Sequence, residues 1–440
     1  MISSTFLKMT SFMRKNKGPP NPSKPTALSR VFSSFASPDF RLLWSYNVLG
    51  SVGKSMETLT LGWLVLIATD SPFWVGAVFG LQGLGQISFG AIGGVIADRL
   101  NRRMVLFVVQ LLRAIIYLML ALLVISESVE LWHLLIVGLL QGILLATLLP
   151  SSEALVYDTV GPRRLLNAVA FTNGAFSLSS IFSFLLAGFL ISAVGVGPTY
   201  LVISGVLVLS PLPILRIRTS HSRPPVEASF WRNLTEGMSY ATKTRPIRSL
   251  LMFSLVMELF GFSYLIMLPV IARDVLYVGA VGLGFLAAAG SVGELLGNLT
   301  LASLGDFKAK SLMVALGGLA AGLSLLLFAL SSWFALSLVL ACLIGVSLGA
   351  YDPTMSTSLQ LRSADFMRGR ILGLYNLTFG FTPLGGFVAG AVATALNPSF
   401  AVGMGGVIIM ASVGFILLPT RSLWKQVEVP APRTVAQSDR

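Results

Sequence analysis

The feature that most constrains this fold is an alternation of long apolar runs with short polar breaks. Each run is long enough to cross a bilayer, because about 20 apolar residues in a helix span the hydrocarbon core. Of the 440 residues, 55% are hydrophobic and 11% are charged, too few charged residues to cover a soluble globule. The pattern predicts an all-α membrane protein with twelve spanning helices, at residues 42–69, 73–97, 104–125, 131–156, 165–194, 198–217, 248–271, 279–304, 311–330, 333–358, 370–393 and 397–419.

Basic residues are concentrated in every second break between the runs. Of 31 Lys and Arg, Lys54 and Arg113 lie inside predicted helices and Arg273 lies on one side of the membrane, which leaves 28 on the other side. Short cytoplasmic loops are enriched in Lys and Arg, so both termini and the basic breaks are expected to be cytoplasmic. The predicted location is the cell membrane, inner or plasma.

Composition and spacing exclude several other classes of protein. The net charge of +13 does not indicate nucleic-acid binding, because the basic residues occupy short loops instead of a folded polar face. Cys342 is the single cysteine, and His133 and His221 lack ligand-like spacing, so neither a disulfide nor a metal site is expected. No nucleophile–base set or ATP-binding P-loop is present. We therefore expect no enzyme activity and no cofactor.

A long polar segment between the sixth and seventh predicted helices divides the chain into two pseudo-symmetric groups of six. At an offset of about 203 residues, Pro150 corresponds to Pro353 and Asn173 to Asn376. The predicted organisation is a cytoplasmic tail at 1–40, a six-helix bundle at 41–218, a cytoplasmic linker at 219–247, a second bundle at 248–420 and a tail at 421–440.

Within the linker, residues 230–242 are expected to form an amphipathic surface helix. The N-terminal tail is expected to be disordered. Three roles stay open for it: attraction to anionic lipid, a leader without a role of its own, or an organellar presequence.

The break after the second predicted helix has an unusual composition, Gly94-Val-Ile-Ala-Asp98-Arg99-Leu-Asn-Arg102-Arg103. Gly94 lets a neighbouring helix approach closely. Asp98 lies at the C-terminal end of its helix, where the helix dipole disfavours an anion, so it needs a compensating partner. Arg102, Arg103 or the N-terminus of the eleventh helix, near residues 369–371, can supply that compensation.

This stretch resembles the signature of the major facilitator superfamily between its second and third helices. The resemblance extends over residues 40–420. Four more stretches are similar to the branch that contains the enterobactin exporter and macrolide-efflux-like proteins: Asp39-Phe-Arg-Leu-Leu-Trp44, Gly161-Pro-Arg-Arg-Leu-Leu-Asn-Ala168, Leu268-Pro-Val-Ile-Ala-Arg-Asp-Val275 and Arg368-Gly-Arg-Ile-Leu-Gly-Leu-Tyr375.

The resemblance implies a role for this signature stretch. Asp98 is expected to contact the eleventh helix, and the arginines are expected to bridge an acid at the end of the fourth helix, for which Asp158 is available. The stretch would then be a latch that holds the two halves together in the outward-facing state. The alternative is topological, with Arg99, Arg102 and Arg103 keeping the loop inside. It explains the arginines but not Asp98.

Charged residues at membrane depth form a second group of candidate site residues: Lys54, Glu57, Arg113, Glu258 and Glu294. Each is costly in a bilayer, so each should face a partner or a wet cavity. Lys54 and Glu57 are three residues apart and can neutralise each other, and the repeat offset also allows a Lys54–Glu258 bridge. Arg113 and Glu294 have no expected partner. We expect Glu57, Glu258 or Glu294 to bind a coupling proton, because buried carboxyl groups can exchange protons near neutral pH. The alternative is structural ion pairing.

Together these features predict a secondary active transporter. The expected activity is proton-coupled export, by an antiporter, of a small amphipathic molecule such as a drug or siderophore through alternating access. The expected partners are that substrate, protons and the lipid bilayer, with a monomeric chain. The fifth helix reads Ser183-Phe-Leu-Leu-Ala-Gly188 where antiporters of the superfamily often have Gly-Pro, which disfavours drug/proton antiport. The alternative is a membrane sensor or scaffold without turnover, but such a protein does not need costly buried charges.

Overall fold

The computed structural model describes residues 33–161, 164–218, 230–304, 310–420 and 423, and in these ranges it contains helices and no strand. The first half of the chain contributes α3 (Pro38–Thr69), α4 (Pro72–Arg99), α5 (Arg102–Ile125), α6 (Leu131–Val160), α7 (Leu165–Val194) and α8 (Val196–Leu209). The linker contributes α9 (Phe230–Lys243). The second half contributes α10 (Arg245–Val256), α11 (Tyr264–Val270), α12 (Gly279–Leu304), α13 (Lys310–Leu330), α14 (Phe334–Arg362), α15 (Arg368–Thr378), α16 (Thr382–Ala395) and α17 (Pro398–Ser412).

Ten helical stretches of the described residues are long and apolar enough to cross a membrane. One of them joins α10 to α11 through the π-helix η3 (Met257–Phe262) and continues into the π-helix η4 (Ile271–Val275), and another joins α15 to α16. The expectation of a helical multi-span protein is therefore confirmed. The remaining two expected spans correspond to α3 and α4, which have 32 and 28 residues but are not among the ten. Lys54 and Glu57 reduce the apolar character of α3, so the exact count of twelve stays a prediction.

Local signals explain where the helices start and stop. The Ser37 hydroxyl accepts the backbone N–H of Phe40 and Pro38 occupies the first turn, a favourable start for α3. Asp70, at φ 48°, ends that helix in the left-handed conformation. Asn397 caps α17 in the same way as Ser37 caps α3, through the N–H of Phe400.

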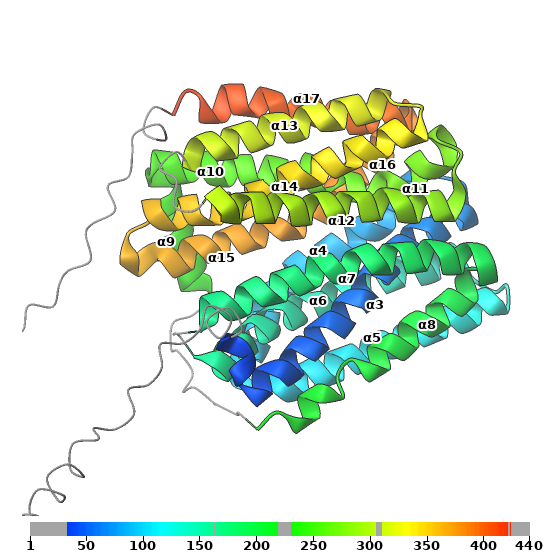
Figure 1. Cartoon of the computed structure of the whole chain (residues 1–440), viewed down its shortest axis with the longest axis horizontal. Helices are drawn as coiled ribbons and strands as arrows, with labels where there is room; N and C mark the ends of the chain where they lie inside the picture. The colour runs from blue at the N-terminus through cyan, green and yellow to red at the C-terminus, as the bar shows by residue number, and fades with distance from the viewer. Residues whose placement is uncertain (1–32, 162–163, 219–229, 305–309, 421–422, 424–440) are drawn as a thin grey trace, which may run out of the picture.

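Helices α3–α8 gather in one half of the molecule and α10–α17 in the other (Figure 1). The same kind of packing occurs in both halves. Glycines bring α4 against α6 in the first half, where a Cβ added at Gly142 would lie 2.0 Å from the carbonyl oxygen of Gln82. In the second half α12 packs as closely on α14, and a Cβ at Gly293 would lie 1.9 Å from the carbonyl oxygen of Cys342. This agrees with the predicted repeat, although the exact domain boundaries stay predictions.

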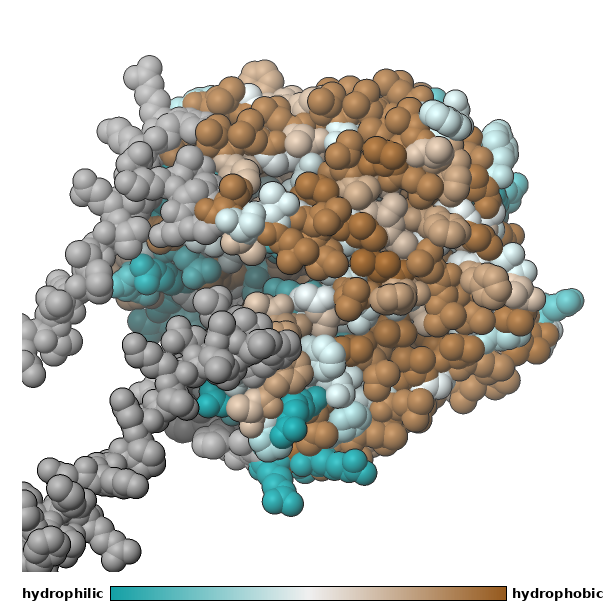
Figure 2. Space-filling model, in the orientation of Figure 1, coloured by the Kyte–Doolittle hydropathy of each residue, from teal (hydrophilic) through white to brown (hydrophobic). Residues whose placement is uncertain are grey.

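The two ends of the molecule differ in charge. We call the end where α4 finishes at Arg99 and α10 begins at Arg245 the basic end, and the end that carries Thr69 and Leu330 the far end. On the face that Figure 2 shows, the surface between the ends is largely apolar and hydrophilic residues gather toward the ends. Such a band of apolar surface fits a surrounding bilayer.

The linker helix α9 is docked on the second half at the basic end. Arg370, in the first turn of α15, forms an ion pair of 2.8 Å with Glu236 and donates to Asn233 at 3.2 Å. The Tyr240 hydroxyl accepts the N–H of Ala364, just before α15. The amphipathic helix expected over residues 230–242 is therefore present. The tail residues 1–32 and linker residues 219–229 lie outside the described ranges.

We expect this docking to weaken in acid. The hydrogen bond from Arg232, followed by the charge of Arg370, holds the pKa of Glu236 below its usual value. A lowered carboxyl pKa means that the pairing contributes fully above the ordinary value of about 4.3 and is lost as pH falls below it. A nitroxide at Met238→Cys, in a Cys342→Ser background, should gain mobility below about pH 4 and at neutral pH in Arg370→Gln, with docking weakened about fivefold. Arg368→Gln is the control, because Arg368 pairs with Asp365 instead of α9. Equal mobility in Arg370→Gln and wild type would contradict this assignment.

Candidate functional site

The two halves touch through glycines near the far end. A Cβ added at Gly76 of α4 would lie 2.6 Å from the carbonyl oxygen of Gly386 in α16. On the opposite side of the interface, a Cβ at Gly188 of α7 would lie 3.0 Å from the Cα of Gly284 in α12. These pairs bring backbones of different halves into direct contact, which only residues without a side chain permit.

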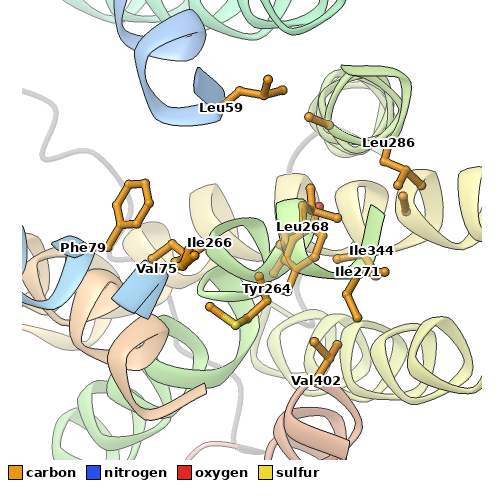
Figure 3. Close-up of a cluster of buried hydrophobic side chains, with 14 of the residues drawn as sticks. Leu59, Val75, Phe79, Tyr264, Ile266, Leu268, Ile271, Leu286, Ile344 and Val402 are labelled. Atoms are coloured by element: carbon orange, nitrogen blue, oxygen red, sulfur yellow. The ribbon is translucent and has the colours of Figure 1, made fainter. Parts of the chain in front are cut away.

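An apolar layer lies beside these glycine contacts. Val75 and Phe79 of α4 lie next to Ile266 of α11, and all three are buried (Figure 3). A Cβ at Gly62 of α3 would lie 2.9 Å from the Pro269 ring, also across the two halves. The far end is therefore sealed by close packing that leaves little room for water or substrate.

Arg273 adds a polar contact between the halves at the same end. It lies in η4 and forms an ion pair of 2.7 Å with Asp70, at the end of α3. It also donates to the carbonyl oxygen of Leu66 at 3.2 Å and pairs with its neighbour Asp274. Asp70 is 86% exposed, so the ion pair contributes little beside the apolar packing. Arg273 was predicted as the one basic residue on its side of the membrane. In the structure it connects the two halves at the far end.

Toward the basic end, several glycines make no such contact. A Cβ added at Gly90 or Gly94 of α4 would meet nothing within 4 Å outside its own helix, and the same holds for Gly369 and Gly373 of α15. Gly174 of α7 is equally free. The halves are thus closely packed toward the far end, whereas α15, at the basic end, makes no extensive contact with a helix of the first half.

The structure brings part of the signature stretch together. Arg102 forms an ion pair of 2.6 Å with Asp158 at the end of α6, so the bridge that the resemblance implied is present. Arg103 donates to the carbonyl oxygen of Ile217 at 2.5 Å. Arg99 is exposed at the end of α4. The side chain of Asp98 lies outside the described part of the structure, so its contact with the eleventh helix stays a prediction.

Glu57 and Arg113 form a buried ion pair, which corrects two expectations. Their N–O distance is 2.5 Å and both side chains are at most 3% exposed. Arg113 also donates to Gln141 and Gln110, and Gln110 donates to Ser210. Glu57 thus forms its ion pair with Arg113 and not with Lys54, which had been the possible partner, and the expectation of an Arg113 without a partner was wrong. Helix α5 presents Arg113 to α3, and this contact between helices cannot be read from spacing within one helix.

Lys54 and Glu258 each contact other groups and not one another. The Lys54 ammonium lies 5.6 Å from the centre of the Phe176 ring in α7, and it interacts electrostatically with Glu57 and with Glu294 across the two halves. Glu258 is 2% exposed and accepts a hydrogen bond from Thr382 of α16. The Lys54–Glu258 bridge suggested by the repeat offset is therefore absent. The offset aligns positions within two separate halves, which need not face each other.

The structure adds groups that the sequence interpretation missed. Asp352 of α14 accepts a hydrogen bond from the Tyr375 hydroxyl of α15 and interacts electrostatically with Glu258 and Glu294. These three carboxyl groups belong to the second half. The signal for Asp352 was available, since it is an acid inside a predicted span, next to Pro353. Gln110 and Gln141 gave a similar but weaker signal, as amides inside apolar runs.

Comparison with known proteins identifies this helical membrane protein as a transporter and not an enzyme. The chain belongs to the transmembrane secretion effector family of the major facilitator superfamily, whose model matches residues 29–432. The resemblance to that superfamily is thus confirmed.

Known relatives and structures agree with this assignment. The enterobactin exporter EntS of Escherichia coli O127:H6 is 25% identical over 390 residues, which covers 87% of this chain and 93% of EntS. A crystal structure of the nucleoside transporter NupG shares the fold with a TM-score of 0.67 at 15% identity, covering 88% of this chain and 99% of NupG. A POT family transporter in complex with 5-aminolevulinic acid has a TM-score of 0.72 at 11% identity, covering 88% and 96%.

Proposed function

We propose that this protein exports a small amphipathic organic molecule by alternating access, driven by protons. The observation that carries the proposal is the asymmetry of the interface, tightly packed toward the far end and without extensive contact between α15 and the first half at the basic end. If the basic end is cytoplasmic, as the positive-inside rule indicates, this arrangement is inward-facing and ready to take up a substrate from the cytoplasm. Exporters and importers both pass through such a state, so we take the direction, export across the inner or plasma membrane, from the exporter relatives.

The substrate class is proposed from the relatives. EntS exports enterobactin, as its name states, so a siderophore is the first candidate and an amphipathic drug the second. Family membership favours transport over the alternative of a sensor or scaffold without turnover. We further propose a monomer, because each chain of this fold contains both halves of the pathway.

The direct test uses inside-out vesicles from cells that express the chain. Radiolabelled enterobactin and ethidium are the two probes. Accumulation of either probe should depend on the chain, require a pH gradient and collapse on addition of an uncoupler. Accumulation that persists after the uncoupler would contradict proton coupling. Accumulation of neither probe above empty-vector vesicles would contradict export of these two substrate classes.

Two carboxyl groups are the best candidates for the coupling proton. Glu57 is committed to its ion pair with Arg113, so we assign it a structural role. Glu258 and Glu294 form no ion pair with a Lys or Arg within 4 Å among the described residues, so neither is committed to a close structural pair as Glu57 is, and each can exchange a proton. We expect Glu258→Gln or Glu294→Gln to lower uptake driven by the pH gradient at least about tenfold. Exposed Glu127→Gln is the control. Full coupling in both variants would remove these residues from the mechanism.

A further inference from the structure

Lys54 and Glu294 lie at the same depth in the molecule, on different halves. Helix α3 reaches the far end at Thr69, fifteen residues after Lys54, and α12 begins at the far end with Gly279, fifteen residues before Glu294. At a rise of 1.5 Å per residue, both side chains are attached about 22 Å from the far end. Helix α7 packs against both α3 and α12, and its Phe176 supports the Lys54 ammonium.

Lys54 lacks a close anionic partner in its own half. Glu57, the nearest acid on α3, is committed to Arg113. The ring of Phe176 offers a cation–π contact, which is weaker than an ion pair at this depth. Glu294 is the anion of the second half with which Lys54 interacts.

The backbone of Glu294 is held rigidly against α14. A Cβ at Gly345 of α14 would lie 2.8 Å from the backbone nitrogen of Glu294, and a Cβ at Gly349 would lie 2.3 Å from its carbonyl oxygen. This close helix contact fixes the backbone of α12 at Glu294. The carboxyl group therefore moves with the second half as a unit.

The other groups near Glu294 supply no positive charge. It interacts electrostatically with Asp352 of α14 and with Tyr264 of α11. Helix α7 contributes no titratable side chain within its described residues. Among the described residues, Lys54 is thus the cation that interacts with the Glu294 carboxylate.

We propose that Lys54 is the counter-ion of Glu294 across the two halves, and that a proton on Glu294 removes this attraction and lets the halves separate. The pair is then the element through which proton binding changes the equilibrium between the two faces. This deepens the proposed function, on which it rests for the direction of transport. The step is balanced, since the proton binds the carboxylate and Lys54 keeps its charge and its place on Phe176.

The test measures the distance between the halves in purified full-length protein. Spin labels at Ser128→Cys and Ser332→Cys, in a Cys342→Ser background, report opening of the far end, because these exposed loop residues belong to different halves there. Lys54→Gln and Glu294→Gln should each lower the far-end-closed population about tenfold. Wild type should shift the same way on acidification, and Glu294→Gln should lose that response. Glu127→Gln, an exposed carboxyl at the same end, is the matched control and should behave as wild type.

The decisive variant is the charge swap Lys54→Glu/Glu294→Lys, which should restore the closed population to within about threefold of wild type. Lys54→Gln/Glu294→Gln is the second test if the swap does not fold. Under the proposal, this double variant has no larger effect than either single one, because both remove the same interaction. Additive effects of the two Gln substitutions would overturn the proposal. So would a charge-swap variant that folds but keeps its far end open. The spin-label distances are measured without substrate. A negative result in this experiment is therefore distinct from a loss of uncoupler-sensitive uptake, which tests the proposed function.

Discussion

Gly390→Leu is expected to abolish transport while the protein still inserts into the membrane. A Cβ at this position of α16 would lie 2.6 Å from the carbonyl oxygen of Pro72 and 3.0 Å from the Cα of Gly76. Atoms at those distances must move apart, and both neighbours are backbone atoms of the other half. The far end can then no longer close, so the cycle stops in one state. Uptake into vesicles should fall at least about a hundredfold, since a shift of about 3 kcal/mol in the closing equilibrium suffices.

Gly205→Leu is the matched control for that variant. Gly205 lies in α8 of the first half, and a Cβ there would meet nothing within 4 Å outside its helix. It changes the same residue type to the same side chain without touching the interface between the halves. Normal transport in Gly390→Leu, with the far-end spin labels at wild-type separation, would show that the glycine contacts do not control closure.

The second large effect is expected from the buried ion pair. Arg113→Gln leaves the Glu57 carboxylate without its ionic partner among side chains that are almost fully buried, at a cost of about 3–5 kcal/mol. The apparent melting temperature in detergent should fall by about 10 °C. The double variant Glu57→Gln/Arg113→Gln should recover most of that loss, because it leaves no buried charge behind.

Arg232→Gln provides the comparison for this pair. Arg232 is 76% exposed and pairs with Glu236 on α9, so its loss should change the melting temperature little. If the double variant were as unstable as Arg113→Gln, the stabilising element would be the surrounding amides and not the charge pair. Melting followed by tryptophan fluorescence in the same detergent distinguishes the two results.

Local sequence patterns predicted some features of this fold and missed others. Apolar run length predicted the spanning helices, and the Ser37, Pro38 and Asn397 signals mark helix starts because each acts within one turn. The Arg102–Asp158 bridge was accessible through a family motif. Arg113 and Glu57 were both recognised as costly, but their partnership links α5 to α3 across 56 positions and was not predicted. Asp352 was overlooked although it is an acid inside a span.

Sequence by itself determined that the chain spans a membrane as helices, which family it belongs to and which residues carry charge at depth. These properties depend on hydropathy and on residue identity along the chain. Only the tertiary structure decided the pairing of Arg113 with Glu57, the electrostatic interaction of Lys54 with Glu294 and the closure of the far end. Each depends on which helix faces which, and at the far end glycine contacts between segments far apart in the chain make that choice.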